Sequence, residues 1–318
     1  MHRFRLMLAL GLFAAAYGVS AQPQGNFPTR AIEIYFPYPP GNSTDAYLRV
    51  LGQAMAKQLG VPVQVINKPG GGGVVGTAEM VRAKPDGYVI GSWTPGPAVT
   101  QVLAGATPYK LGDIQPIAGV FVTPFVLAVK GNLPANNLRE FAEWAKRHGK
   151  PVIIGTYSPA SVPGLIVAKI AKQDGWPYRI VSFPNPTAKE LIAGDADMTT
   201  TGVEMVQGQV KSGDVRVVST WLPDRSKVYP NVPTLKESGH GDIFLVTGLA
   251  APAGVPKDLV AKLAAAAQKA TQDPEVRAHL ERLDIPAVFY GPEEMSTRIA
   301  SETKWMEALM REAGLIKP

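Results

Sequence analysis

The stretch Tyr35-Phe-Pro-Tyr-Pro-Pro-Gly-Asn-Ser-Thr-Asp45 decides the fold of this chain. An apolar strand runs into a turn of prolines and glycine, and the turn ends on Asn42, Ser43 and Thr44. These residue types are favoured N-caps, because their side-chain oxygens accept N–H groups that the first turn of a helix leaves unpaired. We therefore expect a helix over residues 43–59. Its positive dipole end would form an anion site at the turn without an arginine or lysine.

Strands and helices alternate along the first third of the chain. Strands are expected over 32–37, 63–67 and 88–93, and helices over 43–59 and 76–83. This order predicts a parallel sheet covered by helices. The loops that follow the three strands would then meet at one edge of the sheet, where α/β proteins bind ligands.

The alternation starts again in the middle third, which predicts a second lobe. Its strands are expected over 125–129, 152–155, 179–183, 197–201 and 215–220, and its helices over 138–148, 164–173 and 188–193. Residues 244–251 would return to the first lobe, and the remaining chain is mostly helical in pattern. The predicted organisation is a signal peptide over 1–21, a first lobe over 22–123 plus 248–318, and a second lobe over 124–247. Two crossings of this kind suit a hinge that closes on a ligand.

The first residues have the order of a secretory signal peptide. A short basic segment ends at Arg5, an apolar stretch runs from Leu6 to Val19, and Val19-Ser-Ala21 has the small residues of a cleavage site. The apolar stretch is short for a bilayer span. We expect an exported mature chain that begins at Gln22; the alternative is a buried N-terminal helix.

Composition excludes several classes of protein. The chain has no cysteine, which rules out disulfides, thiolate metal sites and a cysteine nucleophile. The formal net charge of +6 falls to +4 on removal of residues 1–21, because Arg3 and Arg5 leave and no acidic residue goes with them. Lysine and arginine are scattered among acids, so nucleic-acid binding is not expected.

An enzyme is the rival class. Beyond the signal peptide the histidines are His148, His240 and His279, and we expect His148 and His279 on the surfaces of helices. None follows the pattern of a nucleophile elbow, and no clustered set of metal ligands appears. The run Gly70–Gly73 has neither the ending of a P-loop nor the spacing of a dinucleotide site. We expect no catalytic residue, no metal and no cofactor.

Seven motifs occur in order along the mature chain. They are Tyr38-Pro-Pro-Gly-Asn-Ser-Thr-Asp45, Val65-Ile-Asn-Lys-Pro-Gly-Gly-Gly-Gly73, Ala83-Lys-Pro-Asp-Gly-Tyr88, Asp224-Arg-Ser, Tyr229-Pro-Asn-Val-Pro-Thr234, Leu249-Ala-Ala-Pro-Ala-Gly-Val-Pro256 and Asp273-Pro-Glu-Val-Arg277. With these motifs the chain resembles the solute-binding receptors of tripartite tricarboxylate transporters, the Bug or TctC type. The resemblance implies the two-lobed α/β fold of type II periplasmic binding proteins. It also implies a periplasmic location and delivery of a small carboxylate to membrane transporter subunits. We further expect a monomer; a receptor that feeds a sensor kinase is the alternative.

The resemblance also implies which residues hold the carboxylate between the lobes. The expected contacts are Asn42, Ser43, Thr44, Asp45, Gly71 and Gly72 from the first lobe, and Thr156, Ser158, Ser161, Thr200 and Thr201 from the second. Tyr38, Trp93 and Thr94 lie at ends of strands, where an aromatic face could stack on a ring or simply pack the wall of the cleft. For Asp45 the alternative is that it stabilises its own helix through the dipole.

Three departures from the family pattern bear on the ligand. The first loop has Gly41-Asn-Ser-Thr-Asp45 where the family usually has Gly-Gly-Gly-Thr-Asp. Pro163-Gly164 replaces a Ser-His pair, and Phe183-Pro-Asn-Pro186 replaces a loop that carries a lysine. The ligand class therefore stays open between a di- or tricarboxylate, an aromatic acid and a smaller or less charged solute.

Overall fold

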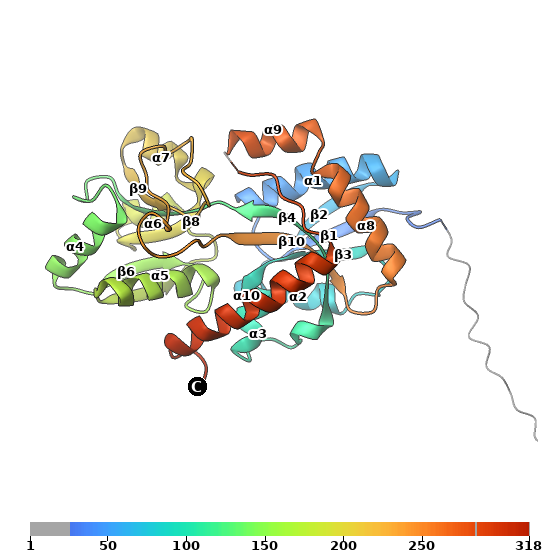
Figure 1. Ribbon diagram of the computed structural model, residues 1–318, viewed down its shortest axis with the longest axis horizontal. Helices are drawn as coiled ribbons and strands as arrows, with labels where there is room; N and C mark the ends of the chain where they lie inside the picture. The colour runs from blue at the N-terminus through green and yellow to red at the C-terminus, as the bar shows by residue number, and fades with distance from the viewer. Residues whose placement is uncertain (1–25, 284, 318) are drawn as a thin grey trace, which may run out of the picture.

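The computed structural model describes residues 26–283 and 285–317, which form two α/β lobes (Figure 1). The predicted signal peptide lies outside these residues. The sheet of the first lobe has the strand order β2-β1-β3-β10-β4. Its strands are β1 (Ile32–Phe36), β2 (Val63–Asn67), β3 (Val89–Trp93), β4 (Ile114–Thr123) and β10 (Leu245–Pro252). Strands β1, β2 and β3 are parallel, and β10 runs antiparallel to both β3 and β4.

Helices cover both faces of this sheet. They are α1 (Ser43–Leu59), α2 (Val74–Val81), the short α3 (Gln101–Leu103), α8 (Lys257–Ala270), α9 (Pro274–Arg282) and α10 (Pro292–Glu312). Helix α1 begins and ends where the sequence predicts. The Asn42 side chain accepts the N–H of Asp45, and Gly60 stops the helix with a left-handed φ of 72°.

The second lobe has its own five-stranded sheet, in the order β7-β6-β8-β5-β9. Its strands are β5 (Phe125–Lys130), β6 (Val152–Thr156), β7 (Tyr178–Ser182), β8 (Met198–Gly202) and β9 (Val215–Thr220). Its helices are α4 (Leu138–His148), α5 (Val162–Asp174), α6 (Ala188–Ala193) and α7 (Gln207–Ser212). Helix α4 also has its predicted bounds, because Asn137 caps its start and Gly149 turns left-handed at its end.

The lobes are joined by two neighbouring crossings. Between β4 of the first sheet and β5 of the second lies the single residue Pro124. The chain returns through β10, which pairs with β4 from Leu245 onward. The first sheet therefore takes in three residues that the sequence analysis placed in the second lobe, 245–247. Both crossings run through the middle of the molecule (Figure 1).

Strand β4 was not expected from the sequence. It contains Pro116 and Gly119, two residue types that are unfavourable inside a strand. The proline is tolerated because β4 is an edge strand, with β10 on one side only within its sheet. The register of the pairing between β4 and β10 shifts between Thr247 and Gly248. Gly248 lies opposite Gly119, so the ladder is irregular at this point.

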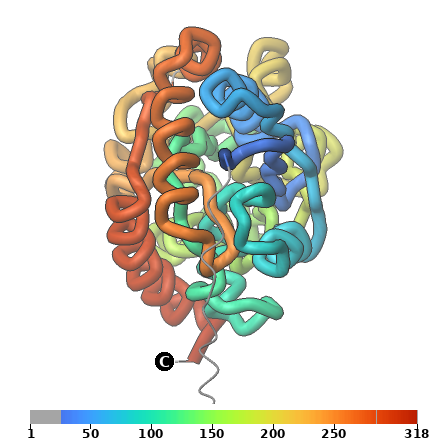
Figure 2. The backbone as a smooth tube through the Cα atoms, turned by 90° about the vertical axis from the view of Figure 1, so that its right-hand side faces the viewer, coloured from blue at the N-terminus to red at the C-terminus, as the bar shows by residue number. Residues whose placement is uncertain are grey.

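Helix α10 spans the two lobes. It packs on β4 and α8 of the first lobe and on α5 of the second. Its buried residues Met306, Leu309 and Met310 belong to the same apolar cluster as Leu165 and Ile170 of α5. Figure 2 views the molecule from the first-lobe end and shows α8 and α10 side by side along one flank.

Candidate ligand-binding site

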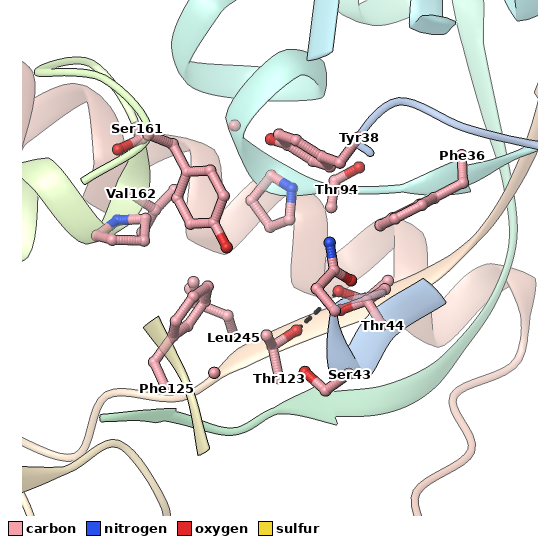
Figure 3. A pocket seen from close by; sticks show the side chains of 17 residues that line it. Phe36, Tyr38, Ser43, Thr44, Thr94, Thr123, Phe125, Ser161, Val162 and Leu245 are labelled. Carbon is pink, nitrogen blue, oxygen red and sulfur yellow. Dashed lines mark hydrogen bonds between the residues drawn. The ribbon is translucent and has the colours of Figure 1, made fainter. Parts of the chain in front are cut away.

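A small cavity of about 60 Å³ lies between the lobes, beside the two crossings (Figure 3). Such a volume holds a few water molecules. None of the described residues that line the cavity is a lysine or an arginine. The lining residues are Phe36, Tyr38, Asn42, Ser43, Thr44, Thr94, Pro95, Gly96, Thr123, Phe125, Tyr157, Ser161, Val162, Pro163, Gly202, Leu245 and Thr247.

The polar side of the cavity is the N-terminus of α1. Asn42, Ser43 and Thr44 are all buried there and all line the cavity. Two of the first-turn N–H groups already have acceptors: that of Asp45 donates to Asn42 Oδ1 at 2.9 Å, and that of Ser43 donates to Glu204 Oε1 at 2.5 Å. Glu204 belongs to the second lobe. The described residues supply no acceptor for the N–H of Thr44, which leaves it for a bound solute.

Aromatic rings form the opposing walls. The Tyr38 ring of the first lobe lies 5.5 Å from the Tyr157 ring of the second, measured between centroids, and Phe36 and Phe125 extend the two sides. Burial raises the pKa of the Tyr38 and Tyr157 hydroxyls, so both stay neutral hydrogen-bonding groups. The Tyr38 hydroxyl makes a long contact of 3.4 Å to the carbonyl of Gly72.

The crossing strands supply the floor of the cavity. Thr123 of β4 and Thr247 of β10 hydrogen-bond through their Oγ1 atoms at 2.9 Å (Figure 3). Leu245 lies beside them. A further hydroxyl, Thr94 Oγ1, is buried without a hydrogen-bond partner among the described residues. Buried polar atoms are seldom unpaired, so Thr94 is a candidate for contact with a bound molecule.

The second-lobe side comes from the start of α5. Ser161 caps this helix: its Oγ accepts the N–H of Gly164 at 3.2 Å and donates to the carbonyl of Ser158 at 2.6 Å. Val162 and Pro163 follow and line the cavity with apolar atoms. Because the Ser161 hydroxyl already has a donor and an acceptor, the start of α5 contributes more shape than hydrogen bonding.

Six residues singled out in the sequence lie together in this lining. They are Tyr38, Asn42, Ser43, Thr44, Thr94 and Ser161. The other eight lie outside it: Asp45, Gly71, Gly72, Trp93, Thr156, Ser158, Thr200 and Thr201. Ser158 remains near, as its Oγ is 3.5 Å from Gln101 Nε2 across the lobes.

Three of the strand-end residues outside the lining, Trp93, Thr156 and Thr201, each directly precede a residue that lines the cavity. Trp93 is 1% exposed and packs in the apolar core, while its neighbour Thr94 faces the cavity. Thr156 and Thr201 are likewise fully buried, and the residues after them, Tyr157 and Gly202, line the cavity. Successive residues of a strand point to opposite faces, so an error of one residue in the phase turns the side chain away. Thr200, one position further back, is buried with its hydroxyl unpaired.

Asp45 and the glycine loop have supporting roles. Asp45 is paired with Arg49 at 3.0 Å and accepts bonds from Asn67 and from the N–H of Gly41, so it holds the turn in place. The glycine loop packs behind Tyr38. Gly73 has a φ of 98°, and a Cβ there would lie 2.9 Å from Pro97 Cγ and 3.3 Å from Tyr38 Cζ. Only glycine fits this position.

None of the described histidines lines the cavity, and two of them, His240 and His279, are buried. His279 of α9 is buried, contrary to expectation, because the helix turns it toward the ring of Tyr47. Burial and the neighbouring Arg282 lower its pKa.

Two lobes that meet over a cavity beside a double crossing have the architecture of a solute-binding receptor. The family model for the tripartite tricarboxylate transporter family receptor, TctC, matches residues 47–315, and the chain belongs to this family. The resemblance drawn from the sequence motifs and the expected two-lobed fold are thereby confirmed. Among the described residues, no helix has the length and apolar character of a membrane span.

Similar proteins are known in sequence and in structure. BugT of Bordetella pertussis is 28% identical, and the match covers 99% of both chains. The solved structure of the periplasmic binding protein BugD aligns with a TM-score of 0.83 at 26% identity, over 92% of this chain and all of BugD. MatC of Rhodopseudomonas palustris, solved with bound malate, aligns with a TM-score of 0.79 at 26% identity, over 89% of this chain and 99% of MatC.

Proposed function

We propose that this chain is a periplasmic receptor that captures a small carboxylate between its lobes and delivers it to the membrane subunits of a tripartite tricarboxylate-type transporter. The observation that supports this most directly is the N-terminus of α1, which lies at the wall of the inter-lobe cavity. Helix N-termini bind anions through free N–H groups and the dipole. The bound malate of MatC agrees with a carboxylate ligand.

The walls favour an acid with an apolar or aromatic body. Phe36, Tyr38, Phe125 and Tyr157 surround the space, and the described residues that line it include no cation to neutralise a highly charged anion. Among the ligand classes that the sequence left open, an aromatic acid suits these rings best, because ring pairs with centroids 4.5–7 Å apart attract one another, at about 0.5–1.5 kcal/mol per pair.

Binding and closure are coupled. In an open form the carboxylate docks on the 41–45 turn, and the second lobe then adds the surface of residues 157–163. Closure lasts while the ligand's preference for the closed form offsets the tendency to open. We propose that one exported chain, cut after Ala21, is the functional unit and that it catalyses no reaction.

A thermal-shift screen tests this function. The mature chain, residues 22–318, is heated with mono-, di- and tricarboxylates, with aromatic acids, and with the amide of each acid as the matched uncharged control. At a ligand concentration of a hundred dissociation constants, binding stabilises the fold by about 2.7 kcal/mol, which raises the midpoint by a few degrees. We expect a shift with an acid and none with its amide. Shifts with neutral or cationic solutes alone would refute the carboxylate assignment.

A further inference from the structure

Glu204 connects the second lobe to the N-terminus of α1. It lies in the 3₁₀ helix η4 (Val203–Met205), which follows β8, and its Oε1 atom accepts the N–H of Ser43 across the interface between the lobes. Its Oε2 atom is buried and has no hydrogen-bond partner among the described residues. Glu204 lies in none of the motifs recognised in the sequence.

The Glu204 carboxyl group lies at the wall of the cavity. Gly202 and Ser43 both line the cavity, and Glu204 contacts both. A Cβ atom on Gly202 would be 2.6 Å from Oε1 and 3.1 Å from Oε2 of Glu204, so the carboxyl group packs directly on the bare Cα of this glycine. A solute in the cavity would therefore be separated from Glu204 by little more than a glycine.

The surroundings of Glu204 offer little compensation for further negative charge. The Tyr157 and Tyr229 hydroxyls are near enough for Glu204 to raise their pKa values, after the larger effect of burial, and both groups are neutral. Burial likewise raises the pKa of the Glu204 carboxyl, and hydrogen bonds from its own backbone N–H and from the side chain and N–H of Ser43 offset this rise only in part. The lining of the cavity holds no lysine or arginine among the described residues. A second carboxylate in the cavity would face this group without a cation between them.

We propose that Glu204 determines ligand specificity: its carboxylate occupies one of the N–H donors at the start of α1 and restricts the receptor to acids that carry a single carboxylate. This inference rests on the proposed function and deepens it. The N–H of Thr44 and the nearby hydroxyls receive one carboxylate, whereas a second one meets a like charge at the wall. Placing like charges together is a known way to reject a competing ligand.

Titration calorimetry with matched acids tests this proposal. The wild type and Glu204→Gln are titrated with hexanoate and adipate, and with benzoate and terephthalate; within each pair only the second carboxylate differs. Glutamine keeps the size of the side chain and an oxygen that accepts the Ser43 N–H. Glu143→Gln, an exposed residue of α4 in the same lobe, is the control for loss of one negative charge.

We expect the wild type and Glu143→Gln to bind the monocarboxylate at least about tenfold more tightly than its partner, since like-charge contacts at interfaces cost several kcal/mol. In Glu204→Gln the affinity for the dicarboxylate should rise until it is within about threefold of the affinity for the monocarboxylate. Glu204→Ala should act in the same direction, which guards against an effect peculiar to glutamine.

Failure of the Glu204 proposal can be distinguished from failure of the proposed function. The role of Glu204 would be overturned, and the proposed function left intact, by either of two findings. One is that the wild type and Glu204→Gln bind carboxylates with the same ratio of monocarboxylate to dicarboxylate affinity. The other is that the wild type prefers the dicarboxylate. If no variant binds any of the four acids or any acid of the thermal-shift screen, the proposed function is refuted, and the inference with it.

Discussion

The hydrogen bond between Thr123 and Thr247 allows a quantitative test of how the crossing strands are held together. The two hydroxyls are 2.9 Å apart, on neighbouring strands β4 and β10 that both lead to the second lobe. Replacing either threonine by valine keeps the shape of the side chain and removes one hydroxyl. The other hydroxyl is then left at the same place without its partner.

The two single substitutions should differ in cost. Leaving a buried hydroxyl unpaired costs about 1–3 kcal/mol. Thr123→Val leaves Thr247, which is 1% exposed, so we expect a loss of about 2 kcal/mol of unfolding free energy. Thr247→Val leaves Thr123, which is 8% exposed, and a cavity water can reach it more easily; we expect about 1 kcal/mol. The double variant replaces both polar groups and should cost less than the sum of the two losses.

Urea unfolding followed by circular dichroism gives the numbers. With a slope of about 3 kcal/mol per molar urea, a loss of 2 kcal/mol lowers the midpoint by about 0.7 M. The double-mutant cycle should then yield a coupling energy of about 1–2 kcal/mol. Thr247→Ser, which keeps the hydroxyl, should retain most of that coupling with Thr123.

Strict additivity would refute this reasoning. If the double variant loses as much as the two single variants together, the hydroxyls do not stabilise one another. The polar floor of the cavity would then have to be explained by contact with the ligand alone.

Three further predictions concern the cavity and the core. Thr44→Ala should weaken binding of the true carboxylate ligand by about 1–2 kcal/mol in calorimetry, as expected for one hydrogen bond to a charged group, while Thr44→Ser changes affinity less. Tyr157→Leu should lower the affinity for aromatic acids more than for aliphatic ones, by about 1 kcal/mol, because it removes one ring–ring contact. His279 is held neutral by burial and by Arg282, so its pKa is below the ordinary 6.5. As the pH falls below 6.5, His279 is protonated in the unfolded chain but not yet in the folded chain. The stability that the neutral His279 contributes is complete above pH 6.5 and is lost as the pH falls below it. The urea midpoint should therefore fall more between pH 7.5 and pH 5.5 in the wild type than in His279→Gln. An equal fall in both proteins would count against this role of His279.

Local signals in the sequence were sufficient for much of the fold. Helices α1 and α4 have their predicted bounds because each is enclosed by an asparagine N-cap and a left-handed glycine. Strand β4 escaped prediction because Pro116 and Gly119 lie inside it. Its stability comes from pairing with β10, a strand more than a hundred residues away, and no local pattern reports that partner.

The cavity was harder to predict than the fold. The α1 turn could be found because the residues that begin the helix, Asn42, Ser43 and Thr44, also line the cavity. At the end of β3 the sequence named both Trp93 and Thr94, and only Thr94 lines the cavity, because the pattern does not fix which of two successive side chains faces it. Glu204 could not be found at all, since its contact with Ser43 joins residues 161 positions apart and depends on how the lobes meet.

The span of α10 across both lobes has a consequence for the heat capacity of ligand binding. If the lobes part while α10 stays on β4, its last turns leave α5, and the methionine and leucine side chains between them meet water. Exposed apolar area raises the heat capacity by about 0.45 cal/mol/K per Å². Closure around a ligand reverses this change. Calorimetry at several temperatures should therefore give a heat-capacity change more negative than the small area of the ligand allows, with the difference supplied by a helix that never contacts the ligand.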